Sequence, residues 1–121
     1  WAGRRIVSRE WVSEATRAQV PADRPPHDPS AWYGHLPGRY GYFWWTNGAD
    51  ARGERLWPNA TPRTCAMQGH LNNICFVIPE WEMVMVRLGE DAVIDDRRYD
   101  GFFAAMRAAF TDGTSREEGA T

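Results

Sequence analysis

The chain contains no lysine, and all 14 of its basic residues are arginine. It therefore supplies no lysine to act as a catalytic base, to form a Schiff base or to bind phosphate as a point charge. The formal net charge of −2 gives no electrostatic reason to expect nucleic acid or an anionic membrane as a partner. No apolar run approaches the roughly 20 residues that a spanning helix needs. We predict neither a nucleic-acid partner nor a membrane span.

Cysteine is also scarce, since Cys65 and Cys75 are the only two and they do not form a CxxC pair. We expect buried, inert thiols rather than a disulfide framework. The chain starts at Trp1, with no methionine and no signal-peptide pattern, so we expect a fragment or a processed piece. The localisation stays open.

The length of 121 residues fits one domain, which we place at 1–113, followed by a flexible tail at 114–121. A helix is predicted over 9–19, because Ser8 can cap its first turn and Pro21 ends it. Val7 and Val12 have the spacing of a hydrophobic staple. The proline-rich segment 21–39 predicts a loop.

Four apolar segments predict an antiparallel sheet, and therefore an α+β fold. They are 40–46, 64–67, 74–78 and 83–88. The last two are expected to be antiparallel neighbours joined across 79–81. Because both are almost continuously apolar, we expect burial on both faces, with helices covering the sheet.

A second helix is predicted near the end of the chain, with Asp95 or Asp96 as its N-cap and Asp112-Gly113 as its stop. From Thr114 onward the polar tail is expected to be disordered. One apolar stripe should pack this helix on the sheet. Its members are Tyr99, Phe102, Phe103, Met106 and Phe110.

The polar cluster 68–73 lies directly before the apolar run 74–78. Polar turns between buried strands need partners for their backbone groups, so they often line a site. The imidazole of His70 in this cluster has two interpretations. It could act as a general base or bond a substrate, or its ring could cap carbonyls in a turn.

The residues around His70 could also suggest a zinc site or a cysteine nucleophile. Cys65, His70 and Cys75 lack zinc-site spacing and a fourth ligand, so neither a metal nor an organic cofactor is predicted. A nucleophilic set of Cys75, His70 and Asn72 is not expected either, because an apolar strand raises a thiol pKa.

Tryptophan is abundant, with seven residues in the chain. Trp32, Trp44, Trp45 and Trp57 could form a platform for sugars, a cleft for acyl groups, or ordinary core. Neighbouring residues of a strand point to opposite faces, so at most one of Trp44 and Trp45 lines a given surface.

Four segments in order resemble one family over most of the chain, from about residue 1 to 110. They are Ser8-Arg9-Glu10-Trp11, Tyr40-Gly41-Tyr42-Phe43-Trp44-Trp45, 67–79 (MQGHLNNICFVIP) and 83–89 (MVMVRLG). The chain resembles the carboxy-terminal portion of β-lactamase-related serine hydrolases. That family includes class C β-lactamases, D-amino-acid peptidases, esterases and 6-aminohexanoate-dimer hydrolases. The resemblance implies an antiparallel sheet covered by helices.

The resemblance also implies site residues. The family's third motif, K-T-G or a degenerate version, falls on Met67-Gln68-Gly69, and Met67 replaces the usual lysine or histidine. The backbone N–H of His70 would then be an oxyanion donor, and Gly69 would let the backbone approach the ligand. The resemblance makes Gln68 and Asn72 substrate contacts, and Trp44 is the tryptophan we assign to the substrate cleft.

The other two family motifs are missing. S-x-x-K requires lysine, and no tyrosine is followed two positions later by asparagine. The resemblance therefore implies that the nucleophile and its base lie in an upstream part of the same domain. The implied substrate is a small-molecule ester or amide. The alternative is a noncatalytic binding module whose tryptophans hold a sugar or a peptide.

Overall fold

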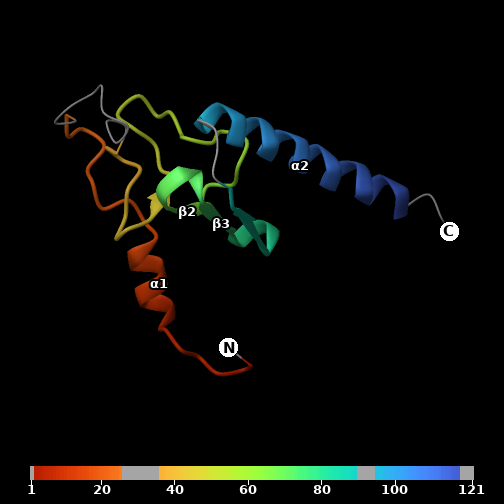
Figure 1. Cartoon of the computed structure of the whole chain (residues 1–121), viewed down its shortest axis with the longest axis horizontal. Helices are drawn as coiled ribbons and strands as arrows, with labels where there is room; N and C mark the ends of the chain where they lie inside the picture. The colour runs from red at the N-terminus through yellow and green to blue at the C-terminus, as the bar shows by residue number, and fades with distance from the viewer. Residues whose placement is uncertain (1, 26–35, 90–94, 118–121) are drawn as a thin grey trace.

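The structure, a computed structural model, describes residues 2–25, 36–89 and 95–117 and shows a small α+β fold. Four antiparallel strands form one sheet in the order β1-β2-β3-β4. The long helix α2 starts beside the sheet and extends beyond it, while the short helix α1 projects from another side of the fold (Figure 1). The elements in chain order are α1 (Arg9–Ala15), β1 (Trp45–Thr46), β2 (Cys65–Gln68), η1 (His70–Asn72), β3 (Ile74–Ile78), η2 (Pro79–Trp81), β4 (Met83–Arg87) and α2 (Asp96–Glu117).

The hydrophobic core lies between α2 and one face of the sheet, the inner face. Phe76 of β3 is fully buried and contacts Tyr99 and Phe103 of α2, with ring centroids 5.1 Å apart in both pairs. Trp57 packs edge-on against Phe76 at 5.0 Å. Tyr99 and Phe103 of the predicted stripe therefore pack on the sheet, whereas Phe102, which was assigned to the same stripe, is 49% exposed.

The other face of the sheet, the outer face, is largely open. The register places Met67, Cys75 and Val86 side by side on it, and Val77 beside Val84. Val84 is 61% exposed and Val86 is 58% exposed. The prediction of burial on both faces is therefore wrong for the described residues. Apolar composition shows that a strand can be buried but does not supply the covering element.

Helix α2 begins as predicted but does not end as predicted. Asp95 caps it, because its carboxylate Oδ1 accepts a hydrogen bond from the Arg98 N–H at 3.1 Å. The helix then continues past Gly113 to Glu117. A glycine in a helix costs only about 1 kcal/mol relative to alanine, so Asp112-Gly113 does not act as a stop. Residues 114–117 belong to this helix, residues 118–121 lie outside the described residues, and the flexible tail stays a prediction.

Helix α1 has the predicted cap but is shorter than the predicted 9–19. The Ser8 hydroxyl accepts a hydrogen bond from the Trp11 N–H at 3.0 Å. The helix ends at Ala15, whose carbonyl accepts a bond from Tyr42 N–H instead of extending the helical ladder. The predicted staple is not buried, since Val7 and Val12 are both exposed.

Strand β1 is much shorter than the predicted strand over 40–46. Phe43 has a φ of 62°, which interrupts an extended strand. Tyr40 instead pairs with Trp45 across a tight reversal, in which Gly41 N–H bonds the carbonyl of Trp44 at 2.8 Å. The described parts of the predicted loop, 21–25 and 36–39, contain no helix or strand, and residues 26–35 lie outside the described residues.

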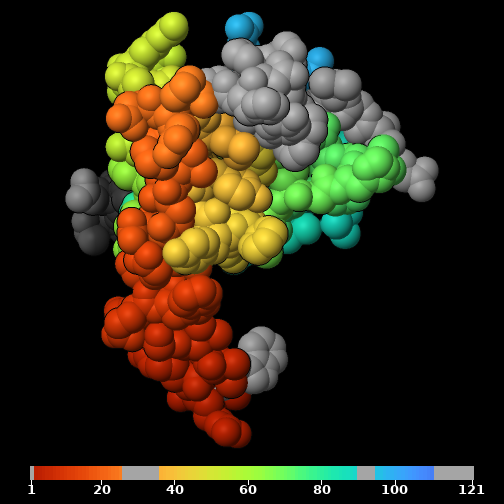
Figure 2. Space-filling view, turned by 90° about the vertical axis from the view of Figure 1, so that its left-hand side faces the viewer, coloured from red at the N-terminus to blue at the C-terminus, as the bar shows by residue number. Residues whose placement is uncertain are grey.

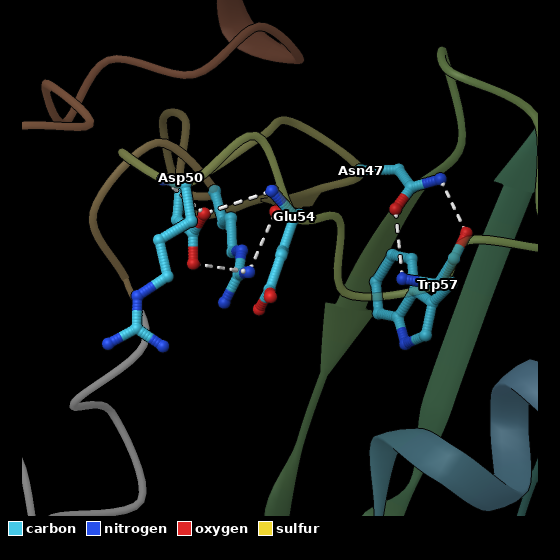
Figure 3. A network of polar contacts seen from close by, with 6 residues as sticks. Asn47, Asp50, Glu54 and Trp57 are labelled. Atoms are coloured by element: carbon cyan, nitrogen blue, oxygen red, sulfur yellow. Dashed lines mark hydrogen bonds and ion pairs between the residues drawn. The ribbon is translucent and has the colours of Figure 1, made fainter.

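A buried asparagine connects β1 to the core. Asn47 donates to the Trp57 carbonyl and accepts from the Trp57 N–H at 3.0 Å (Figure 3). Its side chain also donates to the carbonyl of Thr61. Nearby, Arg39 forms an ion pair with Asp50 at 3.0 Å. These contacts fix the irregular segment 47–64 without regular secondary structure.

Candidate functional site

The polar cluster is a tight turn that joins β2 to β3. Leu71 and Asn72 have φ values of 57° and 58°, as in the central residues of a type I′ turn. The turn is closed by Asn73 N–H, which bonds the carbonyl of His70 at 3.3 Å. Asparagine tolerates this left-handed conformation, but an exposed leucine does so at a cost. Leu71 is therefore a strained residue at the tip of the turn.

The backbone amide of His70 faces away from β3. Gly69 is extended, and its N–H bonds the carbonyl of Asn73 at 2.7 Å, which continues the β2–β3 ladder by one step. Successive N–H groups of a strand point to opposite sides. The N–H groups of Gln68 and His70 therefore point toward the other edge of β2. Neither has a hydrogen-bond partner among the described residues.

Among the described strands, only the start of that edge of β2 is paired, because β1 is short. The register pairs Trp45 with Ala66 and Thr46 with Cys65, so β1 covers only the start of β2. Within residues 36–89, no strand pairs with β2 beyond Ala66 on this side.

The turn is held by two residues that the sequence alone did not indicate as important. The Asn73 side chain donates to the carbonyl of His70 at 2.8 Å and accepts from Gly89 N–H at 3.0 Å. Arg87 of β4 donates to the carbonyl of Asn72 at 2.8 Å. The sequence offered one signal for the role of Arg87, because it is a single arginine at the end of an otherwise apolar strand. These bonds fix the geometry of the turn, which is what a preorganised hydrogen-bond donor requires.

The predicted substrate contacts lie in or next to this turn. Gln68 and Asn72 contact each other, with Gln68 Nε2 donating to Asn72 Oδ1 at 3.1 Å. Trp44 is half-buried and directly precedes β1. Since Trp45 pairs with Ala66, Trp44 is placed one step along β2, toward Met67. The structure thus places Gln68, Gly69, His70 and Asn72 in or next to one turn, with Trp44 directly before β1.

Glycine at position 69 is not required by the local fold. Its φ is −110°, which any residue can adopt. A Cβ there would meet only ordinary contacts, 3.6 Å from the Asn73 carbonyl oxygen and 3.9 Å from its Cβ. Position 69 also follows Met67 on the outer face of the sheet. An alanine at 69 would thus fill space beside the His70 amide without disturbing the fold.

The other side chains considered from the sequence do not assemble a reactive group. The His70 ring is exposed, and the side chain that bonds a turn carbonyl is that of Asn73 rather than the imidazole. Burial, and secondarily the neighbouring Cys75, raises the pKa of Cys65 to about 11, so this thiol is protonated at neutral pH. In the described parts of the chain, no three His, Cys, Asp or Glu residues are grouped to hold a metal ion.

The tryptophans are divided between core and surface. Trp45 and Trp57 are buried in the core, so they do not contribute to a platform. Trp32 lies outside the described residues. Trp11 is exposed and stacks on Tyr42 with ring centroids 5.8 Å apart. Phe43, next to Tyr42, is 88% exposed. The red α1 region projects from the body in Figure 2, where it meets the yellow 40–45 segment.

Chemically, the turn offers one backbone donor to a developing negative charge. The outward amides of Gln68 and His70 are two residues apart, which is about 7 Å along a strand. That is too far for both to bond one oxygen atom. There is no charged residue from Thr64 to Pro79. The turn therefore offers one donor to a single oxygen atom and no charged side chain.

Comparisons with protein-family models, with curated proteins and with solved structures found no match to this chain. Among the described helices, none is long and apolar enough to cross a membrane.

Proposed function

We propose that this chain forms one wall of the acyl-transfer site of a serine hydrolase that cleaves a small ester or amide. The observation that carries the proposal is the backbone N–H of His70. It has no hydrogen-bond partner among the described residues, it points away from β3, and bonds from Asn73 and Arg87 hold its turn in place. The family resemblance of 67–79 assigns an oxyanion donor to the same position.

In this proposal, the serine and the groups that transfer its proton lie in a part of the domain outside this chain. The serine Oγ attacks the acyl carbon, and its proton passes to the proposed base. The carbonyl oxygen then becomes negative and accepts a hydrogen bond from His70 N–H. Collapse of the tetrahedral intermediate expels the alcohol or amine, which takes up the proton, and water later hydrolyses the acyl-serine. Losing one oxyanion donor costs about 3–4 kcal/mol in comparable sites.

The surroundings of the turn suit a largely apolar acyl group. Met67 lies on the outer face directly before the turn and is exposed, and Trp44 directly precedes the neighbouring strand β1. Gln68 and Asn72 provide amide groups that can bond the polar part of the substrate. The proposed fold in the larger domain is that of the β-lactamase-related family.

The test uses the polypeptide that joins this chain to the proposed upstream segment, assayed with a p-nitrophenyl ester and a serine-directed phosphonate. We expect turnover, stoichiometric labelling of one serine outside this chain, and no turnover by the 121-residue chain alone. The proposal is wrong if the longer polypeptide neither hydrolyses the ester nor reacts with the phosphonate.

A pair of glycine variants tests the position of the site. Gly69→Ala should lower kcat/KM by about tenfold to 100-fold, since a misplacement near 1 Å can cost that much, while stability changes by no more than about 0.5 kcal/mol. Gly101→Ala in α2 is the matched control, because a Cβ there meets nothing within 4 Å. It should leave turnover unchanged. Full activity in Gly69→Ala would contradict the placement of the ligand beside His70.

The alternative is a noncatalytic module that binds a sugar, and the Trp11–Tyr42 stack favours it. The exposed ring of Trp11 lies on the same helical segment as Glu14, which is joined to Arg17 by two 2.7 Å hydrogen bonds. Aromatic faces beside paired polar groups are suited to a sugar ring. Titration with a soluble β-glucan oligosaccharide, followed by tryptophan fluorescence, would support this function if the response is lost in Trp11→Ala.

A further inference from the structure

Leu71 occupies a position of the turn that does not suit its residue type. It is the first of the two left-handed residues, with φ 57° and ψ 34°, where turns of this kind strongly favour asparagine, aspartate or glycine. The second position does carry such a residue, Asn72. Leucine adds backbone strain here and also leaves its side chain 47% exposed, so folding alone does not account for it. Strained residues of this kind concentrate at sites that contact a ligand.

The position of Leu71 relative to the His70 amide is fixed by hydrogen bonds. The His70 carbonyl, which belongs to the peptide bond between the two residues, accepts from the backbone N–H of Asn73 at 3.3 Å and from its side chain at 2.8 Å. Arg87 holds the other side of the turn through the carbonyl of Asn72 at 2.8 Å. Leu71 therefore lies one residue from the proposed oxyanion donor, with about 3.8 Å between the two Cα atoms.

This spacing brings the Leu71 side chain within reach of a substrate that is bonded to His70. An oxygen atom that accepts from the His70 N–H lies about 2.9 Å from the nitrogen, so the carbon of the scissile carbonyl lies within roughly 9 Å of the Leu71 Cα. The leucine side chain and a van der Waals contact of about 4 Å cover most of this distance. A substrate chain that extends toward the tip of the turn by about two carbons or more therefore contacts Leu71.

Met67 and Leu71 lie on opposite sides of the His70 amide along the chain. Met67 is on β2 before the turn and is 46% exposed, whereas Leu71 lies beyond the amide at the tip. The two substituents of a scissile carbonyl diverge from its carbon, so one can lie beside Met67 while the other extends toward Leu71. Since the proposed acyl group lies beside Met67, the alcohol or amine part of the substrate is left for Leu71.

The turn also favours an uncharged leaving group. No acidic residue, lysine or arginine lies from Thr64 to Pro79. The basic side chain that does reach the turn, Arg87, donates to the carbonyl of Asn72. A charged leaving group would lose hydration at the turn without an opposite charge in this segment to replace it.

We propose that Leu71 is a specificity-determining residue that contacts the leaving group, and that the substrates are esters or amides of an apolar alcohol or amine. This inference rests on the proposed hydrolase function, because it takes the His70 N–H as the oxyanion donor. It adds a requirement that the proposed function does not contain. The preference for the leaving group and the preference for the acyl group depend on different residues, Leu71 and Met67.

The experiment measures kcat/KM for alkyl esters with the polypeptide that includes the proposed serine. Ethyl butyrate and hexyl butyrate share one acyl group and release alcohols of similar acidity, so their ratio reports contacts to the leaving group. We expect hexyl butyrate to be preferred by about tenfold or more. Leu71→Gly and Leu71→Asn both suit the left-handed backbone and remove the apolar side chain, so each should reduce the preference to about threefold or less. Leu71→Met should retain it.

Two control variants test whether the effect belongs to position 71. Met67→Ala should lower the preference for ethyl hexanoate over ethyl acetate and leave the ratio of the two butyrates as in the wild type. Leu71→Gly should have the opposite pattern. Val84→Ala shortens an exposed apolar side chain on β4 and should change neither ratio.

Urea unfolding distinguishes a substrate contact from a contact with the upstream part of the domain. Leu71→Gly should raise the unfolding midpoint of the 121-residue chain and of the longer polypeptide alike, because it relieves the same strain in both. A midpoint that rises in the short chain but falls in the longer polypeptide would overturn the inference, since Leu71 would then pack against the upstream part.

The kinetic outcomes separate this inference from the function on which it rests. If the esters are hydrolysed and the ratio of the two butyrates is unchanged in both Leu71→Gly and Leu71→Asn, the role of Leu71 is wrong and the proposed function stands. If the longer polypeptide hydrolyses none of the esters, the proposed function is wrong and this inference fails with it.

Discussion

Replacing Phe103 by alanine should remove much of the stability of this fold. The side chain is fully buried and meets three aromatic rings, with centroids 5.1 Å away for Phe76, 6.2 Å for Trp57 and 6.3 Å for Trp81. Truncating such a phenylalanine costs about 3–5 kcal/mol. The total free energy of unfolding of a domain is about 5–15 kcal/mol. With a urea m-value of about 2 kcal/mol/M, the midpoint should fall by about 2 M.

Phe102→Ala is the matched control, because the neighbouring phenylalanine is 49% exposed on the same helix. It should cost no more than about 1 kcal/mol. Urea unfolding followed by tryptophan fluorescence measures both variants, with circular dichroism as a check on two-state behaviour. Equal losses in the two variants would refute the orientation of α2, and with it the assignment of the inner face as the core.

Three further predictions concern the turns and one carboxylate. Leu71→Gly should stabilise the chain by about 1 kcal/mol, because it removes a leucine from a left-handed backbone conformation. The control Asn72→Gly should change the unfolding free energy by only about a few tenths of a kcal/mol. If urea denaturation shows no gain in stability for Leu71→Gly, the turn is not strained at that residue. Asn47→Ala should cost about 2–3 kcal/mol, because it leaves the buried N–H of Trp57 without its partner, whereas the Trp57 carbonyl still accepts from Ala60 N–H; the half-exposed Asn59→Ala, measured in the same way, should cost less. Partial burial tends to raise the pKa of Glu80, but hydrogen bonds from the Thr61 hydroxyl and Arg63 N–H hold that pKa below its ordinary 4.5. Between the lowered native pKa and 4.5, the native state therefore binds fewer protons than the unfolded state. The stabilisation from ionised Glu80 is complete above pH 4.5 and is lost as the pH falls through the lowered native pKa. Glu80→Gln should remove this part of the pH dependence of the unfolding free energy, and an unchanged pH dependence would contradict the lowered pKa.

The sequence predicted those parts of the fold that depend on local interactions. The caps by Ser8 and Asp95 depend on one side chain and the next helical turn, so they could be read directly. The β3–β4 pair could be read as well, because two apolar runs are separated only by 79–81. A short connection leaves antiparallel pairing as the simple arrangement.

The errors arose where distant contacts decide the structure. Residues 16–19 do not continue α1, because the Ala15 carbonyl is taken by Tyr42 N–H. Residues 40–44 do not form a strand, because Phe43 adopts a left-handed φ. The open outer face at Val84 and Val86 could not be anticipated from their apolar character, since burial depends on which element covers the sheet.

The sequence predicted which residues form the candidate site but not how their backbone groups are oriented. The glycine and the polar residues before β3 indicated a turn with exposed backbone groups. The direction of the His70 amide followed only from the register of Gly69 with Asn73. The supporting role of Arg87 requires that the end of β4 reach the turn between β2 and β3, which no local pattern contains.

The measurement that tests the central claim most directly is amide hydrogen exchange at residue 70 in the polypeptide that includes the proposed serine. Before inhibition, His70 N–H should exchange fast while Gly69 N–H, bonded at 2.7 Å, exchanges slowly. After the phosphonate has reacted, its oxygen should bond the His70 amide and slow that exchange. A His70 amide already protected before inhibition, or unchanged after it, would contradict the account.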